Sequence, residues 1–271
     1  MSTETLDPAL AAKHRTMWAA GDYPAIATDL VASLGPILVS TTGIGSGEHV
    51  LDVAAGTGSA SIAAALTGAS VIASDLTPEL LVAGQAVADG LGVEVLWREA
   101  NAEDLPFADD EFDAVVSSIG VMFAPHHQLA ADELVRVCKP GGRIGVLSWT
   151  PEGFIGQMFA TMKPYVPAPP PGASPPPLWG NEDHVRTLFG DRADITSRRD
   201  ALAVTHFATG AALRDYFKTN YGPTIMAYRQ IADDPARVAA LDADLAELGD
   251  SALAGSSTMH WEYLLVLALK R

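Results

Sequence analysis

Several features that constrain other proteins are scarce in this sequence. Its single cysteine, Cys138, cannot form an internal disulfide, which is typical of proteins in a reducing compartment. Basic residues are also few, since 17 Lys and Arg stand against 33 Asp and Glu and leave a formal net charge of −16. That charge repels the phosphates of nucleic acids and anionic lipids. We therefore expect that the protein binds neither nucleic acid nor membranes.

Long hydrophobic runs and metal-binding patterns are missing as well. No apolar run approaches the roughly 18 residues of a membrane-spanning helix, and the first residues lack the apolar core of a signal peptide. The seven histidines show no spacing typical of metal ligands. A composition that is 48% hydrophobic and 18% charged is globular. These features predict a cytoplasmic protein without a metal site, and they leave its oligomeric state open.

The order of helix and strand patterns divides the chain into three parts. Residues 1–45 have apolar positions at helical spacings and predict an N-terminal helical cover. Residues 46–150 alternate strand and helix patterns, as βαβ units of a parallel sheet do. Residues 151–271 are expected to form cap insertions, at 151–192 and 208–255, and strands that complete the sheet. The expected strands are 49–54, 71–76, 94–98, 112–118, 143–149, 201–207 and 260–269, the last added antiparallel at an edge.

Proline is concentrated in one stretch of the last part. Eight of the 18 prolines fall within residues 164–177. Proline lacks a backbone N–H and fixes φ, so this density excludes both helix and sheet ladder. The stretch is interpreted either as a surface connector or as the edge of a lid over a pocket.

A glycine-rich turn follows the first expected strand, in the segment VLDVAAGTG at residues 50–58. Gly56 and Gly58 allow a tight turn and the close approach of a ligand. A dinucleotide-binding fingerprint has glycine or alanine where Ser61 stands here. Asp52 would face a pyrophosphate unfavourably, but it suits a ligand with a cationic end and no phosphate. S-adenosylmethionine is such a ligand.

Polar residues also follow the next three strands. Asp75 ends the second strand, where an acidic side chain accepts hydrogen bonds from ribose hydroxyls. Asn101 follows the third strand and is a candidate for the adenine edge, together with backbone groups of Ala102. Ser117 ends the fourth strand, where carbonyl groups would hold an ammonium. The predicted cofactor-binding residues are Asp52, Ala54, Gly56, Thr57, Gly58, Asp75, Leu76, Asn101, Ala102 and Ser117.

The chain resembles the class I S-adenosylmethionine-dependent methyltransferases in five segments that occur in register: VLDVAAGTG, IASDLTPELL, NAEDLPF, FDAVVSS and ELVRVCKPGGRIGVLSWT. The resemblance is greatest to the branch that includes ubiquinone and menaquinone biosynthesis, and it covers roughly residues 46–150. It implies an α/β fold with a doubly wound, Rossmann-like sheet of seven strands, the last antiparallel. It also implies S-adenosylmethionine contacts at Asp52, Gly56, Gly58, Asp75, Asn101 and Ala102. The chain departs from the family at Ala54, which replaces the usual first glycine, and at Asn101, where an acid is common.

The sequence says less about the acceptor of the methyl group than about the cofactor. His126 and His127 follow the fourth strand, at the edge where open α/β sheets bind ligands, and are candidates for a catalytic base. The alternative interpretation is that they cap the helix that follows. His206, Tyr221 and His260 are further candidate bases in the last third of the chain.

An apolar acceptor pocket is expected from the aromatic residues Trp18, Phe123, Trp149 and Trp179, each of which has the alternative of packing in the core. The fourth strand lacks the D/N-P-P-Y/W motif of base-amino methyltransferases and a nucleophilic cysteine for RNA methylation. A small, fairly apolar organic acceptor therefore remains, methylated on O, N or C. A non-catalytic S-adenosylmethionine-binding protein and, less well supported, an NAD(P)-dependent oxidoreductase are the alternative functions.

Overall fold

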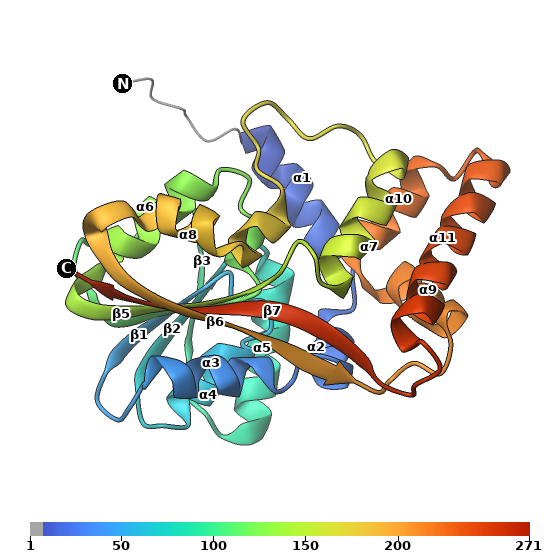
Figure 1. Ribbon diagram of the computed structural model, residues 1–271. Coiled ribbons are helices and arrows are strands. Elements are labelled where there is room, and N and C mark those ends of the chain that lie inside the picture. Colours follow the sequence, from blue (N-terminus) through green and yellow to red (C-terminus); the bar gives the residue numbers. More distant parts are fainter. Residues whose placement is uncertain (1–7) are drawn as a thin grey trace.

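The computed structural model describes residues 8–271 and contains one seven-stranded sheet with helices on both faces (Figure 1). The strand order is β3-β2-β1-β4-β5-β7-β6. The strands are β1 (His49–Val53), β2 (Ser70–Asp75), β3 (Leu96–Glu99), β4 (Phe112–Ser118), β5 (Cys138–Trp149), β6 (Ala193–Val204) and β7 (Met259–Lys270). The expected Rossmann-like α/β sheet is confirmed.

Strand directions follow from the apolar patterns. β1 pairs in parallel with both β2 and β4, and its central residues Val50 and Leu51 are fully buried because helices cover both faces. β7 runs antiparallel to its two neighbours, as expected, but its expected place at an edge is wrong. β7 lies between β5 and β6 because its apolar run, from Tyr263 to Val266, is buried on both faces, which an edge strand avoids.

The sixth strand begins earlier than expected. β6 starts at Ala193 rather than near residue 201, and it forms one edge of the sheet. The missed half contains Asp194, Arg198, Arg199 and Asp200, which hide the strand pattern and are exposed because this is an edge. Charged side chains on an edge strand also discourage pairing with another chain.

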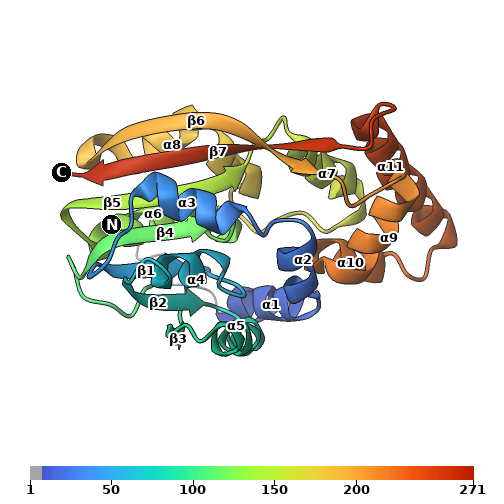
Figure 2. The same cartoon turned by 90° about the horizontal axis from the view of Figure 1, so that it is seen from below.

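Helices cover the sheet in two layers and gather at one end. α3 (Leu34–Thr42), α4 (Ser59–Ala65) and α5 (Pro78–Leu91) cover one face, and α6 (His127–Val137) and α8 (Glu182–Phe189) cover the other (Figures 1 and 2). Six further helices lie beyond the carboxyl ends of the parallel strands: α1 (Pro8–Ala19), α2 (Tyr23–Asp29), α7 (Phe154–Met162), α9 (Gly210–Asn220), α10 (Gly222–Gln230) and α11 (Pro235–Leu253). We call α7 and α9–α11 the cap helices. The cap is thus built from two segments far apart in the sequence.

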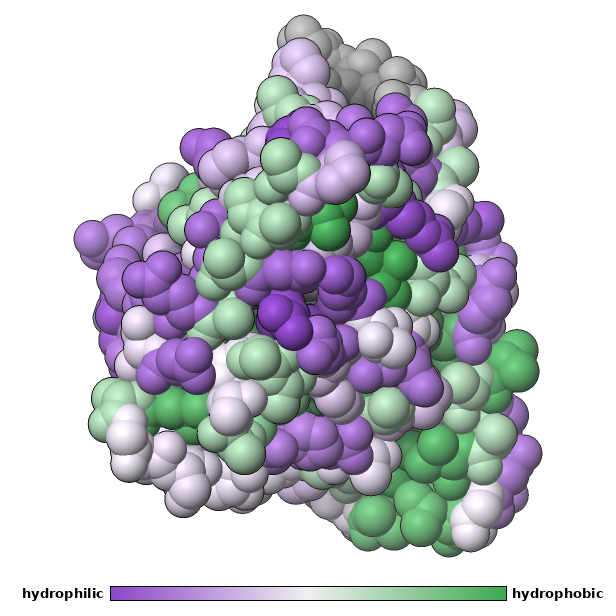
Figure 3. Space-filling model, turned by 90° about the vertical axis from the view of Figure 1, so that its right-hand side faces the viewer, coloured by the Kyte–Doolittle hydropathy of each residue, from purple (hydrophilic) through white to green (hydrophobic). Residues whose placement is uncertain are grey.

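The outward surface of the cap end mixes polar and apolar residues. Figure 3 shows hydrophilic residues over most of its middle, with hydrophobic surface gathered toward the lower right. In residues 8–271 no single helix has the length and apolar character needed to cross a membrane, although the bent pair α2 and α3 together meets those two criteria.

Candidate functional site

A cavity of about 230 Å³ lies at the carboxyl ends of the strands, between the sheet and the helices beyond it. Open α/β sheets bind ligands in this position. Its polar end is lined by residues that follow β1, β2 and β3: Ala54, Gly56, Thr57, Asp75, Leu76, Asn101, Ala102 and Glu103. Its aromatic end is lined by Trp18, Phe123, Trp149, Phe217, Tyr221 and Trp261. Four of these aromatic residues come from outside the alternating strand–helix region.

The glycine turn leads from β1 into α4. Gly56 lines the cavity with φ of 58°, and a Cβ added there would meet no atom within 4 Å, so the backbone is open to a ligand. Gly58 has φ of 82° and does not line the cavity; its missing Cβ instead makes room for the Trp97 ring, 2.4 Å from that position. Ala54, in place of the family's first glycine, adopts φ of 54°. The two glycines therefore serve different purposes.

Asp75 is one of two acidic residues, with Glu103, that line the polar end. Its two carboxylate oxygens accept hydrogen bonds of 2.8 Å from the backbone N–H groups of Gly56 and Thr77. Burial raises the pKa of Asp75 above its usual value, although these bonds oppose the shift. The carboxylate fixes the glycine turn and presents its remaining lone pairs to the cavity.

Asp52 lies one layer deeper and does not line the cavity. One of its oxygens accepts a 2.6 Å hydrogen bond from Ser61, and the other is buried with no hydrogen-bond partner in residues 8–271. Burial is the largest influence and raises the pKa of Asp52 to about 7. A buried carboxylate that lacks a partner favours a nearby positive charge. Ser61, which stands where a dinucleotide fingerprint has glycine or alanine, thus positions the Asp52 carboxylate by a hydrogen bond.

The loop after β3 carries a second group of polar residues. The Asn101 side-chain oxygen accepts a 3.0 Å bond from the Glu103 backbone N–H, which leaves the Asn101 amide NH₂ as a donor. Glu103 is almost fully buried; it accepts the backbone N–H of His126 at 2.6 Å, and His126 Nδ1 lies 3.1 Å from its other oxygen. His14 also lines the cavity, and burial lowers its pKa while the charge of Glu103 partly opposes the shift. Glu103 therefore contacts the His126 imidazole directly and influences that of His14 through its charge.

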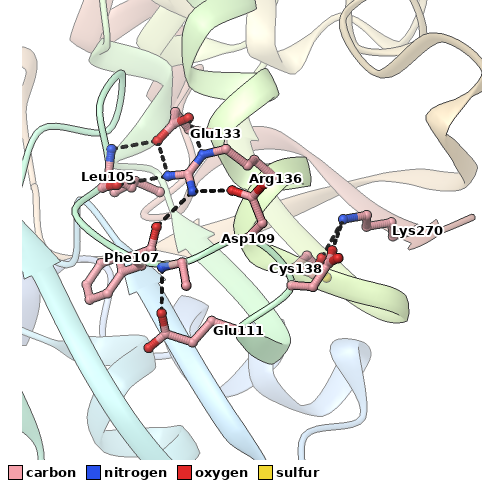
Figure 4. A network of polar contacts seen from close by, with 10 residues as sticks. Leu105, Phe107, Asp109, Glu111, Glu133, Arg136, Cys138 and Lys270 are labelled. Atoms are coloured by element: carbon pink, nitrogen blue, oxygen red, sulfur yellow. Dashed lines mark hydrogen bonds and ion pairs between the residues drawn. The ribbon is translucent and has the colours of Figure 1, made fainter.

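Arg136 holds the remainder of this loop in place (Figure 4). Its guanidinium donates to the carbonyls of Leu105 and Phe107 at 2.8 Å each and to the carboxylates of Glu133 and Asp109. Glu133 also accepts the backbone N–H of Leu105 at 2.6 Å. The network anchors the β3–β4 loop to α6 and so restrains the segment that carries Asn101.

Aromatic rings form a connected cluster at the other end. The Trp18 ring lies 4.6 Å from Phe123 and 6.5 Å from Tyr221, measured between centroids. Tyr221 in turn lies 5.5 Å from Phe217, and Phe217 lies 5.9 Å from Trp261. The first three pairs are edge-to-face, and such pairs stabilise the structure beyond the area that they bury. In residues 8–271 no Lys or Arg lines the cavity.

The structure brings together most of the residues predicted from the sequence, but not all of them. Ser117 is buried outside the cavity, where its hydroxyl donates to the Val53 carbonyl at 2.6 Å. His127 also lies outside: its Nδ1 is 3.0 Å from His184 Nε2, and burial lowers its pKa to about 4. Trp179 is fully buried beside His127, with ring centroids 5.7 Å apart. These two residues occupy the core between α6 and α8.

Other cavity residues were not among the predicted site residues. His14 lies one helical turn before Trp18 on α1, so this spacing of four was a usable signal. Tyr23, Phe217 and Trp261 also line the cavity and had no such signal. Of the alternative bases, Tyr221 lines the cavity, whereas His206 and His260 are exposed outside it.

Comparison with known proteins agrees with this geometry. Residues 51–146 match the methyltransferase domain model. A protein of Mycobacterium tuberculosis (strain H37Rv), described as uncharacterised, is 58% identical over 261 residues, 96% of this chain and 95% of its own. The demethylmenaquinone methyltransferase of Clavibacter sepedonicus is 44% identical over 105 residues, 39% of this chain and 42% of its own. A crystal structure of a putative methyltransferase from Bacillus halodurans, 18% identical, superimposes with a TM-score of 0.59 over 88% of this chain and 99% of its own.

The fold and the site therefore define a class I S-adenosylmethionine-dependent methyltransferase. Within that class the chain belongs to the same family as the mycobacterial protein, which it matches over nearly its whole length. The residues present fit the cofactor, S-adenosylmethionine. The unpartnered oxygen of Asp52 suits a cationic ligand, and Asp75 suits a ribose. The absence of Lys and Arg from the cavity lining in residues 8–271 suits a ligand without phosphate.

Proposed function

We propose that this methyltransferase acts on a small, fairly apolar organic molecule and methylates it on oxygen, nitrogen or carbon. The observation that carries the proposal is the aromatic end of the cavity, continuous with the polar end. When bound, S-adenosylmethionine supplies a methyl group that leaves its sulfonium sulfur as the acceptor atom attacks in line. The protein's contribution is to hold the two reactants in that geometry, which by itself lowers the barrier substantially.

The polar end is proposed to hold the cofactor. Asp75 would accept hydrogen bonds from the two ribose hydroxyls, and the amide NH₂ of Asn101 would donate to the adenine edge. Gly56 would admit the methionine portion close to the backbone, because no Cβ stands in the way. Asp52, beneath the turn, would favour the positive sulfonium and ammonium groups.

His126 is proposed as the base when the acceptor is a hydroxyl or an acidic carbon. It lines the cavity, three residues after Phe123 of the aromatic end. With Nδ1 protonated and donating to Glu103, the lone pair of Nε2 is free to take the acceptor's proton. His127 lacks this access and is proposed to have a structural role.

The test is formation of S-adenosylhomocysteine from S-adenosylmethionine with a panel of neutral aromatic alcohols, amines and acidic carbon compounds. We expect turnover with at least one member of the panel. For an O–H or C–H acceptor, His126→Gln should reduce kcat by about 10²-fold or more without changing cofactor affinity. The exposed His260 gives a matched control, and His260→Gln should leave the rate unchanged. Equal rates for wild type and both variants would remove His126 from the mechanism.

A further inference from the structure

The Tyr221 hydroxyl is a polar group of the aromatic end that has no partner in residues 8–271. Tyr221 lines the cavity, and its ring is enclosed by Trp18, Tyr23 and Phe217. Its hydroxyl oxygen is not sealed inside the protein, unlike the indole nitrogen of Trp261. The free hydroxyl therefore faces the space in which a ligand would lie.

The backbone holds Tyr221 firmly in this position. It is the single residue between α9 and α10, and its own N–H donates to the Phe217 carbonyl at 3.1 Å. The following N–H, of Gly222, donates to the Tyr23 hydroxyl oxygen at 3.2 Å. A third bond joins the Asp22 N–H to the Asn220 carbonyl at 2.9 Å. Asp22 and Tyr23 thus hold the residues on either side of Tyr221 in the chain, Asn220 and Gly222.

The residues of this end disfavour anionic ligands. Burial raises the pKa of Tyr221 far above its usual value, so the side chain is a neutral phenol that donates a hydrogen bond and does not act as a base. No Lys or Arg in the described lining would neutralise a carboxylate or phosphate. Burying an unpaired anion among aromatic rings is unfavourable, because its hydrating water is removed and no cationic side chain replaces it.

We propose that the acceptor is a flat aromatic molecule without negative charge and that the Tyr221 hydroxyl positions it by donating a hydrogen bond to one of its oxygen or nitrogen atoms. The inference rests on the proposed function, because it assigns the aromatic end to the acceptor. Tyr221 is then the residue that orients the acceptor, while the surrounding rings supply the stacking surface.

The test uses three probes that share the same naphthalene ring system: naphthalene, 2-methoxynaphthalene and naphthalene-2-carboxylate. Each is titrated calorimetrically into the protein with and without saturating S-adenosylhomocysteine. The ether oxygen accepts a hydrogen bond and the hydrocarbon cannot, so Tyr221→Phe should weaken the ether about fivefold and leave naphthalene within about twofold. The carboxylate should bind at least about tenfold more weakly than the ether to the wild type.

Tyr216 on α9 gives the matched control. Its hydroxyl donates to Asp29 at 2.9 Å at the surface and lies outside the cavity lining. Tyr216→Phe should change neither naphthalene nor ether binding. Equal weakening of both probes by Tyr221→Phe would overturn the proposal, as would no weakening, no probe binding, or tight binding of the carboxylate. Failure of S-adenosylhomocysteine to bind would instead contradict the proposed function, and the probe series on the free protein would still test the role of Tyr221.

Discussion

At the polar end of the cavity, the lining groups come from the carboxyl ends of β1, β2 and β3 and from the turns that follow them. At the aromatic end they come from α1, η1 (Val121–Phe123), the end of β5, α9 with its junction to α10, and β7, positions spread over more than 240 residues of sequence. The polar end is held by backbone hydrogen bonds to carboxylates, as Asp75 illustrates. The aromatic end is held by ring contacts. This contrast fits the proposed function, in which the polar end would hold the cofactor and the aromatic end the acceptor.

Of the predictions that test this contrast between the two ends, the largest effect is expected for Asp52. Its folded-state pKa of about 7 lies above the ordinary value near 3.8. The unfolded chain therefore ionises first, and the stability of the ligand-free protein falls as pH rises from about 4 to 7. Between pH 5 and pH 8 the wild type should lose roughly 2–3 kcal/mol of unfolding free energy relative to Asp52→Asn. Urea unfolding at the two pH values measures this difference, and parallel pH profiles for both proteins would contradict it.

Asp75→Asn should have the next largest effect, on the cofactor. The amide retains one acceptor oxygen but places an NH₂ against a backbone N–H that now donates to the carboxylate. We expect S-adenosylhomocysteine to bind more weakly by about 1–3 kcal/mol. Titration calorimetry measures the loss, with the exposed Asp104→Asn as control. Unchanged affinity in folded Asp75→Asn would remove the ribose assignment.

Arg136→Met, followed by urea unfolding, measures how much the network of Figure 4 contributes to stability. The substitution leaves two loop carbonyls and the partly buried Glu133 without their shared donor. We expect a loss of about 1–2 kcal/mol in unfolding free energy, because the guanidinium is about one-third exposed and water compensates in part. The control is Arg186→Met, which breaks an exposed pair with Glu182 and should cost less than about 0.5 kcal/mol. Equal losses would mean that the network contributes no more than a surface ion pair.

Phe217→Leu should have the smallest effect on the cofactor and so separates the two ends. The leucine retains an apolar side chain but removes the ring that lies against Tyr221 and Trp261. Affinity for S-adenosylhomocysteine should stay within about twofold, while 2-methoxynaphthalene should bind more weakly by about 0.5–1.5 kcal/mol. A larger change in the cofactor than in the probe would show that the two ends are not independent.

The same contrast explains which parts were predictable from the sequence. The glycine turn follows β1, Asp75 ends β2 and Asn101 lies just after β3, and the parallel sheet brings the carboxyl ends of these strands to one edge. Local sequence order therefore fixes their proximity. The first half of β6 was not predicted, because its charged residues hide the strand pattern. The place of β7 in the sheet was not predicted either, because it depends on pairing with β5 and β6, which are far away in the sequence.

The aromatic end depends on tertiary packing, which short-range patterns do not encode. Trp149 and Trp179 were both expected at the acceptor pocket, yet Trp149 lines the cavity and Trp179 is buried in the core. His126 and His127 are adjacent but face opposite ways, toward the cavity and toward His184. The residues of the proline-rich stretch 164–177 lie outside the cavity lining, and the Ser174 N–H donates to the Pro125 carbonyl at 2.8 Å, next to His126 in the chain.

The central claim is that the polar end binds S-adenosylmethionine, and calorimetric titration with S-adenosylhomocysteine tests it most directly. NAD and NADP are titrated alongside, because a glycine turn after a buried strand also serves dinucleotides. The account predicts saturable binding of S-adenosylhomocysteine alone, weakened in Asp75→Asn. Binding of NAD or NADP, or no binding of S-adenosylhomocysteine to the folded protein, would contradict it.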